Sequence, residues 1–390
     1  MVNPEEKRLI HISSARKSAE YVCREVEALG YKVDSHKENG VFLKGNYRDC
    51  MRLNLHLRTA YRVLWHLGDV KAPGPDDLYR KARKLEWERI IEPEGYISIN
   101  SHVENSFILD NRFANVRLKD AIVDRFNEIY GKRPDSGPDT DKTVIYLYWV
   151  EGRASLYLDT SGGPLSKHGY RKFPYKAPLL EGLGASIIMA SRWDGQSSFI
   201  NPMCGSGTLA IEAALMGIDK VPGLMKDNFG FMHTLFYNQD VWEELRTEAL
   251  GKVKNTVSFK IVASDINEVA IDAARNNAAM AGVDHLIEFS VCDFRDTPVY
   301  NDGGVVIINP EYGERLGETS ELEDIYKAMG DFFKAKCQGY TGYIFTGNFA
   351  LAKKIGLRTS RRIEFYNATI ECRLLEFELY SGSRKITPND

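Results

Sequence analysis

A polar tetrad follows a buried strand late in the chain. Val305–Ile308 is a run of four apolar residues, and Asn309, Pro310, Glu311 and Tyr312 come directly after it. An amide oxygen and a backbone carbonyl can accept the N–H groups of a planar amine, while an aromatic ring can stack on its face. The tetrad therefore predicts a corner that holds an amino-bearing base.

A second strand end, earlier in the chain, runs into glycines and a helix. Its candidate ligand-binding residues are Asn201, Met203, Gly205, Gly207 and Thr208. Glycines let a ligand approach the backbone, and the helix that follows offers N–H groups to an anion. A dinucleotide could supply that anion, and so could the carboxylate of S-adenosylmethionine. No lysine follows the glycines, which excludes a phosphate-binding loop of the GK[ST] type.

Acidic residues close the next two strands. Asp265, with Ile266 after it, ends the run that begins at Ile261, and its carboxylate could accept a ribose hydroxyl. Asp227 has a similar spacing from the glycines but follows no strand. Asp293 could accept the adenine amino group while Phe294 covers the purine. Taken singly, Asp265 and Asp293 are ordinary turn residues and Phe294 is an ordinary core residue.

The four strand ends together favour methyl transfer from S-adenosylmethionine to an exocyclic amine. Methylation of a carbon would call for a cysteine nucleophile, but Cys204 lies in the glycine loop and Cys292 directly precedes the second acid. The amine reaction needs alignment more than a nucleophile. We therefore expect Asn309 and Pro310 to accept the N–H groups of a flipped base and Tyr312 to stack on it.

The elements that position these residues change in character along the chain. From 177 onward strands alternate with helices, which predicts an α/β fold with a doubly wound parallel sheet and a hairpin over 362–380. Such sheets bind ligands at the carboxyl ends of their strands. The preceding region mixes strands and helices as an α+β unit, with one helix expected over Leu53–Leu67. Residues 218–256 are expected to form an insertion.

The composition limits the class of protein. The chain has 390 residues, 43% of them hydrophobic, and a net charge of −3, so two or three folded domains are expected. No apolar stretch is long enough to span a bilayer. Six scattered cysteines without a C-x-x-C pair predict reduced thiols, no metal site and a cytoplasmic location.

A basic and aromatic stretch lies before the alternating region. Its candidate RNA-binding residues are Lys167, His168, Tyr170, Arg171 and Lys172. Cations interleaved with aromatic rings suit phosphate contact and base stacking. A solvated hinge is the alternative.

The chain resembles the bacterial THUMP-containing 23S rRNA guanine-N2 methyltransferases, a class I S-adenosylmethionine-dependent family. The resemblance rests on 167–171, 177–179, 201–208, 211–214, 222–223 and 309–317. It implies a ferredoxin-like region over 1–60, a THUMP RNA-binding domain over 61–160, a linker over 161–176 and a Rossmann-like methyltransferase domain over 177–385. It also implies S-adenosylmethionine as cofactor and ribosomal RNA, or a large-subunit assembly intermediate, as partner.

Three positions depart from the family pattern. Glu311 replaces a second proline, which removes a constraint on φ beside the base. Asn201 replaces an acid, and His168 replaces an arginine. Two rival functions stay open: an adenine-N6 DNA methyltransferase, and a non-catalytic RNA-binding or assembly factor. The sequence does not predict which nucleotide is modified or the oligomeric state.

Overall fold

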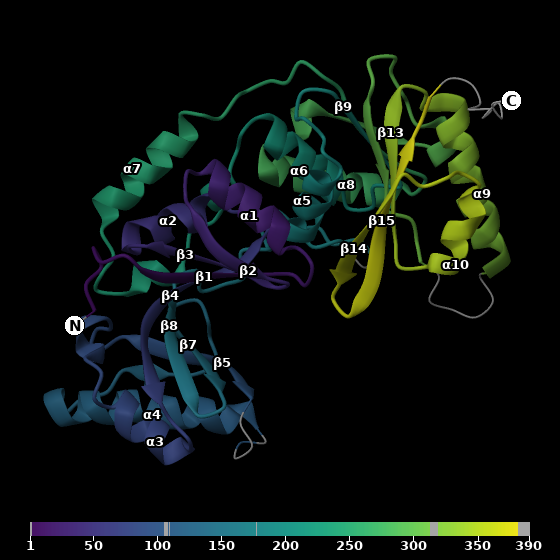
Figure 1. Ribbon diagram of the computed structural model, residues 1–390. Coiled ribbons are helices and arrows are strands. Elements are labelled where there is room, and N and C mark those ends of the chain that lie inside the picture. The colour runs from purple at the N-terminus through teal and green to yellow at the C-terminus, as the bar shows by residue number, and fades with distance from the viewer. Residues whose placement is uncertain (1, 105–107, 109, 177, 313–318, 381–390) are drawn as a thin grey trace, which may run out of the picture. The chain divides into compact units, whose positions relative to one another are not determined.

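The chain forms two compact units, each with its own sheet (Figure 1). The computed structural model describes residues 2–104, 108, 110–176, 178–312 and 319–380. The first unit contains Met1–His168 and Val221–Gly251, and the second contains Gly169–Lys220 and Lys252–Asp390. Among the described residues, no helix combines the length and the hydropathy needed to cross a bilayer.

The first unit is an eight-stranded sheet with helices, in the order β2-β3-β1-β4-β8-β7-β5-β6. Its strands are β1 (Arg8–Ser14), β2 (Val33–Lys37), β3 (Gly40–Gly45), β4 (Ala60–Lys71), β5 (Tyr96–Glu104), β6 (Asp135–Ser136), β7 (Thr143–Val150) and β8 (Arg153–Asp159). Its helices are α1 (Ala19–Ala28), α2 (Tyr47–His56), α3 (Pro75–Ala82), α4 (Asn111–Tyr130) and α7 (Gln239–Leu250), with short 3-10 turns η1 (Trp87–Arg89), η2 (Pro222–Met225) and η3 (Gly230–His233). The α+β prediction for this region is confirmed.

The prediction of a single helix over Leu53–Leu67 is wrong. Helix α2 ends at His56 and strand β4 begins at Ala60. The half-buried Glu25 carboxylate accepts the backbone N–H groups of Arg58 at 2.8 Å and Thr59 at 3.0 Å. Two of the residues between α2 and β4 are therefore bonded to a distant residue of α1. A tertiary hydrogen bond thus overrides a local apolar pattern that suits a helix.

Residues 221–251 complete the first unit although they interrupt the sequence of the second. The Tyr47 hydroxyl contacts the Phe231 carbonyl at 3.2 Å and the Thr234 hydroxyl at 2.7 Å. Gly223 lies so close to Leu55 that an added Cβ would stand 2.5 Å from its Cα. Of the insertion expected over 218–256, residues 221–251 therefore pack into the first unit, and its two ends belong to the second.

The second unit is a seven-stranded sheet in the order β11-β10-β9-β12-β13-β15-β14. Its strands are β9 (Ser198–Pro202), β10 (Ile261–Asp265), β11 (Ile287–Val291), β12 (Gly304–Ile308), β13 (Tyr340–Thr346), β14 (Arg361–Asn367) and β15 (Ile370–Glu378). Its helices are α5 (Glu181–Ala190), α6 (Thr208–Gly217), α8 (Glu268–Ala281), α9 (Thr319–Lys336) and α10 (Phe349–Ala352), with η4 (Asp284–Leu286), η5 (Phe294–Asp296) and η6 (Lys353–Ile355).

The sheet of the second unit is covered on both faces. Helices α5, α6 and α8 lie on one side of it and α9 and α10 on the other (Figure 1). Strand β12 consists of Gly304-Val305-Val306-Ile307-Ile308, and its last four residues are buried, as expected for a parallel strand between two helical layers. Strands β14 and β15 form the predicted hairpin, and β15 pairs antiparallel with β13. The predicted α/β, Rossmann-like fold is confirmed.

The strand order reverses direction between β9 and β12. From β9 the chain continues to β10 and β11 on one side, and it then returns to β12 on the other side of β9. The two strands are parallel, with Phe199 opposite Val305 and Ile200 opposite Val306. A reversal of this kind opens a crevice at the carboxyl ends of the two strands, where open α/β sheets bind their ligands.

Candidate functional site

The glycine loop and the asparagine-led tetrad follow the two strands that flank this reversal. The Asn201 side chain, at the end of β9, donates from Nδ2 to the Ile307 carbonyl of β12 at 2.9 Å. Gly205 lies four residues after Asn201, and Asn309 lies two residues after Ile307. Both predicted sites therefore lie at one edge of one sheet.

The glycine loop adopts backbone conformations that its sequence explains. Gly205 has φ +54 and Gly207 has φ +83, a region that residues with a side chain rarely occupy. A Cβ at Gly207 would stand 2.9 Å from the Cβ of Ala274 on α8, whereas a Cβ at Gly205 would meet nothing within 4 Å. Gly207 therefore permits close packing of α6 on α8, and Gly205 leaves open space above the loop.

The acid predicted at the next strand end lies against this loop. Asp265 Oδ2 accepts the Gly205 backbone N–H at 3.0 Å, and its Oδ1 accepts that of Asn267 at 3.0 Å. Asp265 thus caps a turn, as expected of an ordinary turn residue, and it also fixes the glycine loop. The carboxylate keeps lone pairs for a further donor. Asp227 belongs to the first unit.

Two features of this edge suit a bound S-adenosylmethionine. Asn201 Oδ1 is buried and has no hydrogen-bond partner among the residues that the structure describes, a costly state that a ligand donor would relieve. Ile266, beside Asp265, exposes 72% of its surface, which is unusual for an isoleucine and offers an apolar contact. Met203 has φ +53 and packs against the core, so it shapes the loop. These residues fit the cofactor.

The remaining cofactor candidates are bonded within the protein. Asp293 accepts the Arg295 backbone N–H at 2.9 Å and pairs with the Arg295 guanidinium at 2.8 Å. Phe294 is 5% exposed and packs edge-on against Phe332. The Thr208 hydroxyl lies 3.3 Å from the Leu179 carbonyl. The contacts of Asp293 are those of a turn residue and the contacts of Phe294 are those of a core residue. A cofactor role for either of them stays a prediction.

The tetrad after β12 is closed on itself. The Tyr312 hydroxyl donates to Asn309 Oδ1 at 3.0 Å, the same oxygen that is expected to accept the amine of a base. Burial raises the pKa of Tyr312 far above its usual value, so this hydroxyl is a protonated donor. Pro310 is buried and Glu311 is exposed. Asn309 Oδ1 has two lone pairs, so the amine of a base could either join the Tyr312 hydroxyl there or replace it.

Two side chains outside the tetrad hold its backbone. Asn348, which follows β13, donates from Nδ2 to the Tyr312 carbonyl at 2.9 Å. The Tyr326 hydroxyl of α9 lies 3.3 Å from the Glu311 carbonyl and 2.8 Å from the Thr346 hydroxyl. Residues 313–317, the remainder of the 309–317 segment that resembles the family, lie outside the described residues.

The basic and aromatic stretch divides into buried and exposed members. His168 is fully buried and donates to the Arg58 carbonyl at 2.9 Å. Tyr170 is 2% exposed and donates to Glu212 at 2.9 Å. These contacts assign His168 and Tyr170 to the core. Lys167 and Lys172 are exposed.

Arg171 is also directed into the protein. Its guanidinium contacts the Leu179 carbonyl, the Thr208 hydroxyl at 2.9 Å and the Glu181 carboxylate at 3.6 Å. The side chain is only 11% exposed. Arg171 therefore joins the starts of α5 and α6, and a contact with RNA by Arg171, His168 or Tyr170 would need these side chains to leave their partners.

The sequence did not single out Asn277 on α8. This asparagine is fully buried, and its Nδ2 donates to the Ser206 carbonyl of the glycine loop at 3.2 Å. It lies on an apolar helix face with Ala270, Ala274 and Ala281, and a lone amide on such a face is a signal for buried hydrogen bonds. Asn348 was likewise missed, although it also follows a strand end.

The cysteine in the glycine loop, Cys204, is not suited to covalent catalysis. Burial raises the pKa of the Cys204 thiol well above its usual value, and the nearby Asp265 carboxylate adds to the shift. A thiol is a nucleophile only as a thiolate. The chemistry of this edge is therefore that of alignment and hydrogen bonding.

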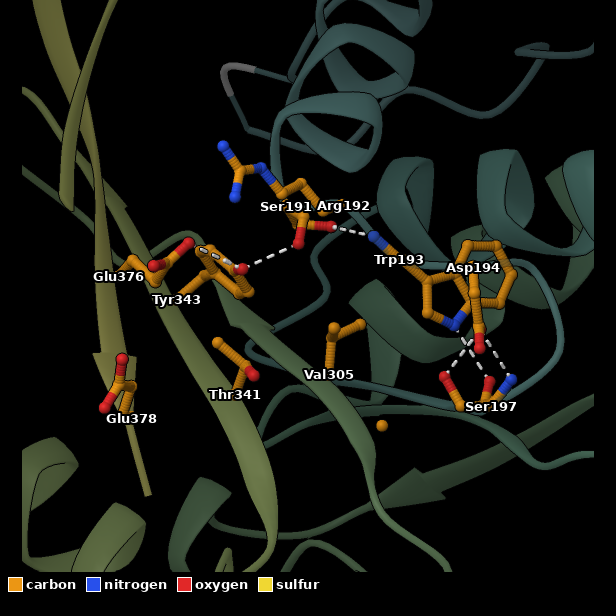
Figure 2. Close-up of a pocket in the computed structure, with 11 residues that line it drawn as sticks. Ser191, Arg192, Trp193, Asp194, Ser197, Val305, Thr341, Tyr343, Glu376 and Glu378 are labelled. Carbon is orange, nitrogen blue, oxygen red and sulfur yellow. Dashed lines mark hydrogen bonds between the residues drawn. The ribbon is translucent and has the colours of Figure 1, made fainter. Parts of the chain in front are cut away.

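A cavity of about 420 Å³ lies elsewhere in the second unit (Figure 2). Its walls include Gly304 at the start of β12 and Thr341 near the start of β13, so it opens at the amino edge of these strands. Tyr343 spans it, with its hydroxyl bonded to the Ser191 carbonyl at 2.6 Å and to Glu376 at 2.9 Å. The cavity is therefore at the opposite edge from the glycine loop and the tetrad.

Family models match three successive parts of the chain. Residues 17–64 match an RlmL ferredoxin-like domain, residues 75–159 a THUMP domain, and residues 168–376 an RMKL-like methyltransferase domain. The last match alone covers more than half of the chain.

Named relatives align along nearly the whole length. A protein of Syntrophotalea carbinolica named ribosomal RNA large subunit methyltransferase K/L is 36% identical over 91% of this chain and 51% of its own length. A Synechocystis protein named as an RNA methyltransferase is 33% identical over 92% of this chain and 93% of its own. The chain spans about half the length of the K/L relatives that it matches.

Solved structures share the fold. One of them, a protein named as a methyltransferase and complexed with SAH, has a TM-score of 0.87 at 26% identity and covers 97% of this chain and 100% of its own. The likeness extends over both units.

Proposed function

This chain belongs to the RMKL-like methyltransferase family, and we propose that it transfers a methyl group from S-adenosylmethionine to the exocyclic N2 amine of a guanine in 23S ribosomal RNA. The observation that carries the proposal is the shared edge. The Asn201 amide bonds to the Ile307 carbonyl and so joins the strand before the glycine loop to the strand before Asn309. A methyl donor held by the loop and an amine held by the tetrad would then meet.

The residues that would hold the cofactor are those of the loop and of the next strand end. They are Asn201, Met203, Gly205, Gly207, Thr208, Asp265, Ile266, Asp293 and Phe294. Asn201 Oδ1 is a buried acceptor without a partner in the described part of the chain, the position for an N–H donor. When bound, the cofactor supplies a sulfonium methyl group that is already activated for transfer.

The protein's part in the reaction is alignment. Asn309 Oδ1 and the Pro310 carbonyl accept the N–H groups of the guanine amine, which turns its lone pair out of conjugation and toward the methyl donor. Tyr312 stacks on the base. Holding both reactants in this geometry converts an encounter in solution into a unimolecular step, which is worth up to about 7–11 kcal/mol of barrier.

The RNA partner is supported by the first unit and by the relatives' names. A THUMP match over residues 75–159 precedes the methyltransferase match over 168–376. The exposed cation Lys167 lies between the two matches, and the exposed Lys172 lies near the start of the second. We propose ribosomal RNA, free or in a large-subunit assembly intermediate, as the substrate, and the cytoplasm as the place of reaction.

A methylation assay, together with a cofactor-binding measurement, separates this proposal from its rivals. The purified chain is incubated with S-adenosylmethionine and, in parallel, with unmodified 23S rRNA transcript or double-stranded DNA. The products are then digested to nucleosides for mass spectrometry. We expect N2-methylguanosine from the transcript. N6-methyladenine from DNA would support the DNA methyltransferase instead, and failure to bind S-adenosylmethionine in calorimetry would support the non-catalytic factor.

A further inference from the structure

The segment that opens the second unit presents one aromatic ring to solvent. Phe173 exposes 44% of its surface, and Lys172 and Lys176 beside it are exposed as well. Tyr170, three residues earlier, is buried. Among the residues 169–173, the exposed ring is therefore that of Phe173, which the sequence alone did not distinguish from its neighbours.

The backbone under this ring is fixed by one buried side chain. Asn277 Oδ1 accepts the backbone N–H of Lys172 at 3.1 Å and that of Phe173 at 3.0 Å. Its Nδ2 donates to the Phe173 carbonyl at 2.9 Å. Both polar backbone groups of Phe173 are thus bonded to a residue in the core of α8, which argues against a solvated hinge at this point.

The same amide ties Phe173 to the glycine loop. Asn277 Nδ2 lies 2.9 Å from the Phe173 carbonyl and 3.2 Å from the carbonyl of Ser206, which stands between Gly205 and Gly207. The backbone that carries the exposed ring is therefore held beside the loop expected to bind the methyl donor.

The charge around the ring indicates the class of partner. Between residues 160 and 180 the chain has four Lys or Arg residues and no Asp or Glu. Lys176 also lies over the Tyr175 ring at 5.9 Å. Exposed cations next to a fixed aromatic ring are the components of surfaces that bind single-stranded nucleic acid, in which the cations contact phosphates and the ring stacks on a base.

We propose that Phe173 is a stacking platform for an RNA base that neighbours the methylated one, and that Lys172 contacts an adjacent phosphate. The inference rests on the proposed function and names a substrate contact for that site. Extruding the target base unstacks its neighbours. A rigid ring beside the cofactor loop offers one of them a replacement surface at little entropic cost, because Asn277 has already fixed the backbone.

The test measures RNA binding separately from turnover, in the full chain. Phe173→Ala, Phe173→Leu and Phe173→Trp are compared by fluorescence anisotropy with labelled 23S rRNA transcript, and S-adenosylmethionine affinity is measured by calorimetry. We expect Phe173→Ala and Phe173→Leu to weaken RNA binding about 5- to 100-fold. Phe173→Trp should stay within about twofold of wild type, since it keeps an aromatic face. Cofactor affinity should be unchanged in all three.

Two further variants sharpen the result. Met280→Ala removes an apolar side chain of similar exposure (52%) from α8 and should leave RNA binding unchanged. Lys172→Ala should lower the slope of log Kd against log salt concentration by about one. RNA affinity of Phe173→Ala equal to that of wild type would overturn the inference. A wild-type chain that binds the transcript but methylates no RNA would overturn the proposed function while leaving Phe173 testable.

Discussion

The two loops at the carboxyl edge of the second sheet are held in different ways. The glycine loop is bonded to three neighbours: Cys204 N to the Ser264 carbonyl at 2.9 Å, Gly205 N to Asp265, and the Ser206 carbonyl to the buried Asn277. The backbone of the tetrad after β12 is bonded to the side chains of Asn348 and Tyr326. The Tyr312 side chain bonds to Asn309 within the tetrad and also interacts with Cys372 and Asn367.

This difference matches the two tasks that we propose for the loops. A cofactor arrives in one form at every turnover, so a loop that is already ordered binds it without a further ordering cost. We propose that a flipped base displaces the Tyr312 hydroxyl from Asn309, so that its loop changes partners during each cycle. Variants that loosen the glycine loop should therefore lower cofactor affinity, and variants in the tetrad should lower turnover.

The largest effect should come from Asn309→Ala. The variant removes the side-chain acceptor for the amine, and we expect kcat to fall on the order of 10³-fold, as when an active-site group that stabilises the transition state is removed. S-adenosylmethionine affinity should stay within about twofold, because no contact of the glycine loop is lost. Single-turnover methylation of 23S rRNA transcript and calorimetry with the cofactor measure the two quantities.

Loss of cofactor affinity in Asn309→Ala would contradict the separation of tasks, because it would show that the tetrad and the glycine loop are energetically coupled. The control is the single variant Met280→Ala, which alters an exposed residue of α8 and leaves both loops unchanged.

The next largest effect should come from Asn277→Asp. The change keeps the shape of the side chain but replaces the N–H donor to the Phe173 and Ser206 carbonyls by an oxygen. Each buried carbonyl left without its donor costs about 1–3 kcal/mol. We expect the free energy of unfolding to drop by about 2–4 kcal/mol and the cofactor Kd to rise about 10- to 50-fold, because the loop must then be ordered on binding.

Asn276→Asp is the matched control for Asn277→Asp. Asn276 is the adjacent residue on α8 and is exposed, so the same chemical change should leave both unfolding and cofactor binding near wild type. Urea unfolding gives the stability term. A normal cofactor Kd in a destabilised Asn277→Asp would show that Asn277 supports the fold without positioning the loop.

These asparagines also show where sequence reasoning stops. The apolar runs before Asn201 and Asn309, and the glycines that need positive φ, are local patterns, and they predicted that the two segments share one edge of the sheet, as they do. Asn277 lies 71 residues from Ser206, and no local pattern names its partner. The break before β4 depends in the same way on Glu25, which is 33 residues from Arg58.

Burial was the other quantity that the sequence did not supply. The stretch 167–173 alternates cations and rings whether a ring faces solvent or core. The structure buries His168 and Tyr170 and exposes Phe173. The predicted RNA-binding residues therefore included the exposed Lys167 and Lys172 together with the buried His168 and Tyr170, and they left out Phe173.

A smaller effect is expected for Asn348→Ser. Asn348 Oδ1 caps α10 by accepting the N–H groups of Ala350 and Leu351, and its Nδ2 donates to the Tyr312 carbonyl. Serine is an equally good cap but is too short to replace the second bond. We expect kcat to fall about tenfold, with stability within about 0.5 kcal/mol and cofactor affinity unchanged. A change in melting temperature without a change in kcat would assign Asn348 to capping alone.

The smallest effect, and the most specific one, should come from Tyr312→Phe. The phenyl ring keeps the stacking face, but it removes the hydroxyl that donates to Asn309 Oδ1 at 3.0 Å. On our proposal a base that binds the wild-type chain breaks this bond, which contributes about 0.5–1.5 kcal/mol, whereas in the variant Asn309 is already available. We therefore expect the KM for 23S rRNA transcript to fall by about threefold while kcat stays unchanged. A kcat lower by tenfold or more would mean that the hydroxyl takes part in the transition state, so the closed tetrad would be part of the working site rather than a resting form that the base displaces.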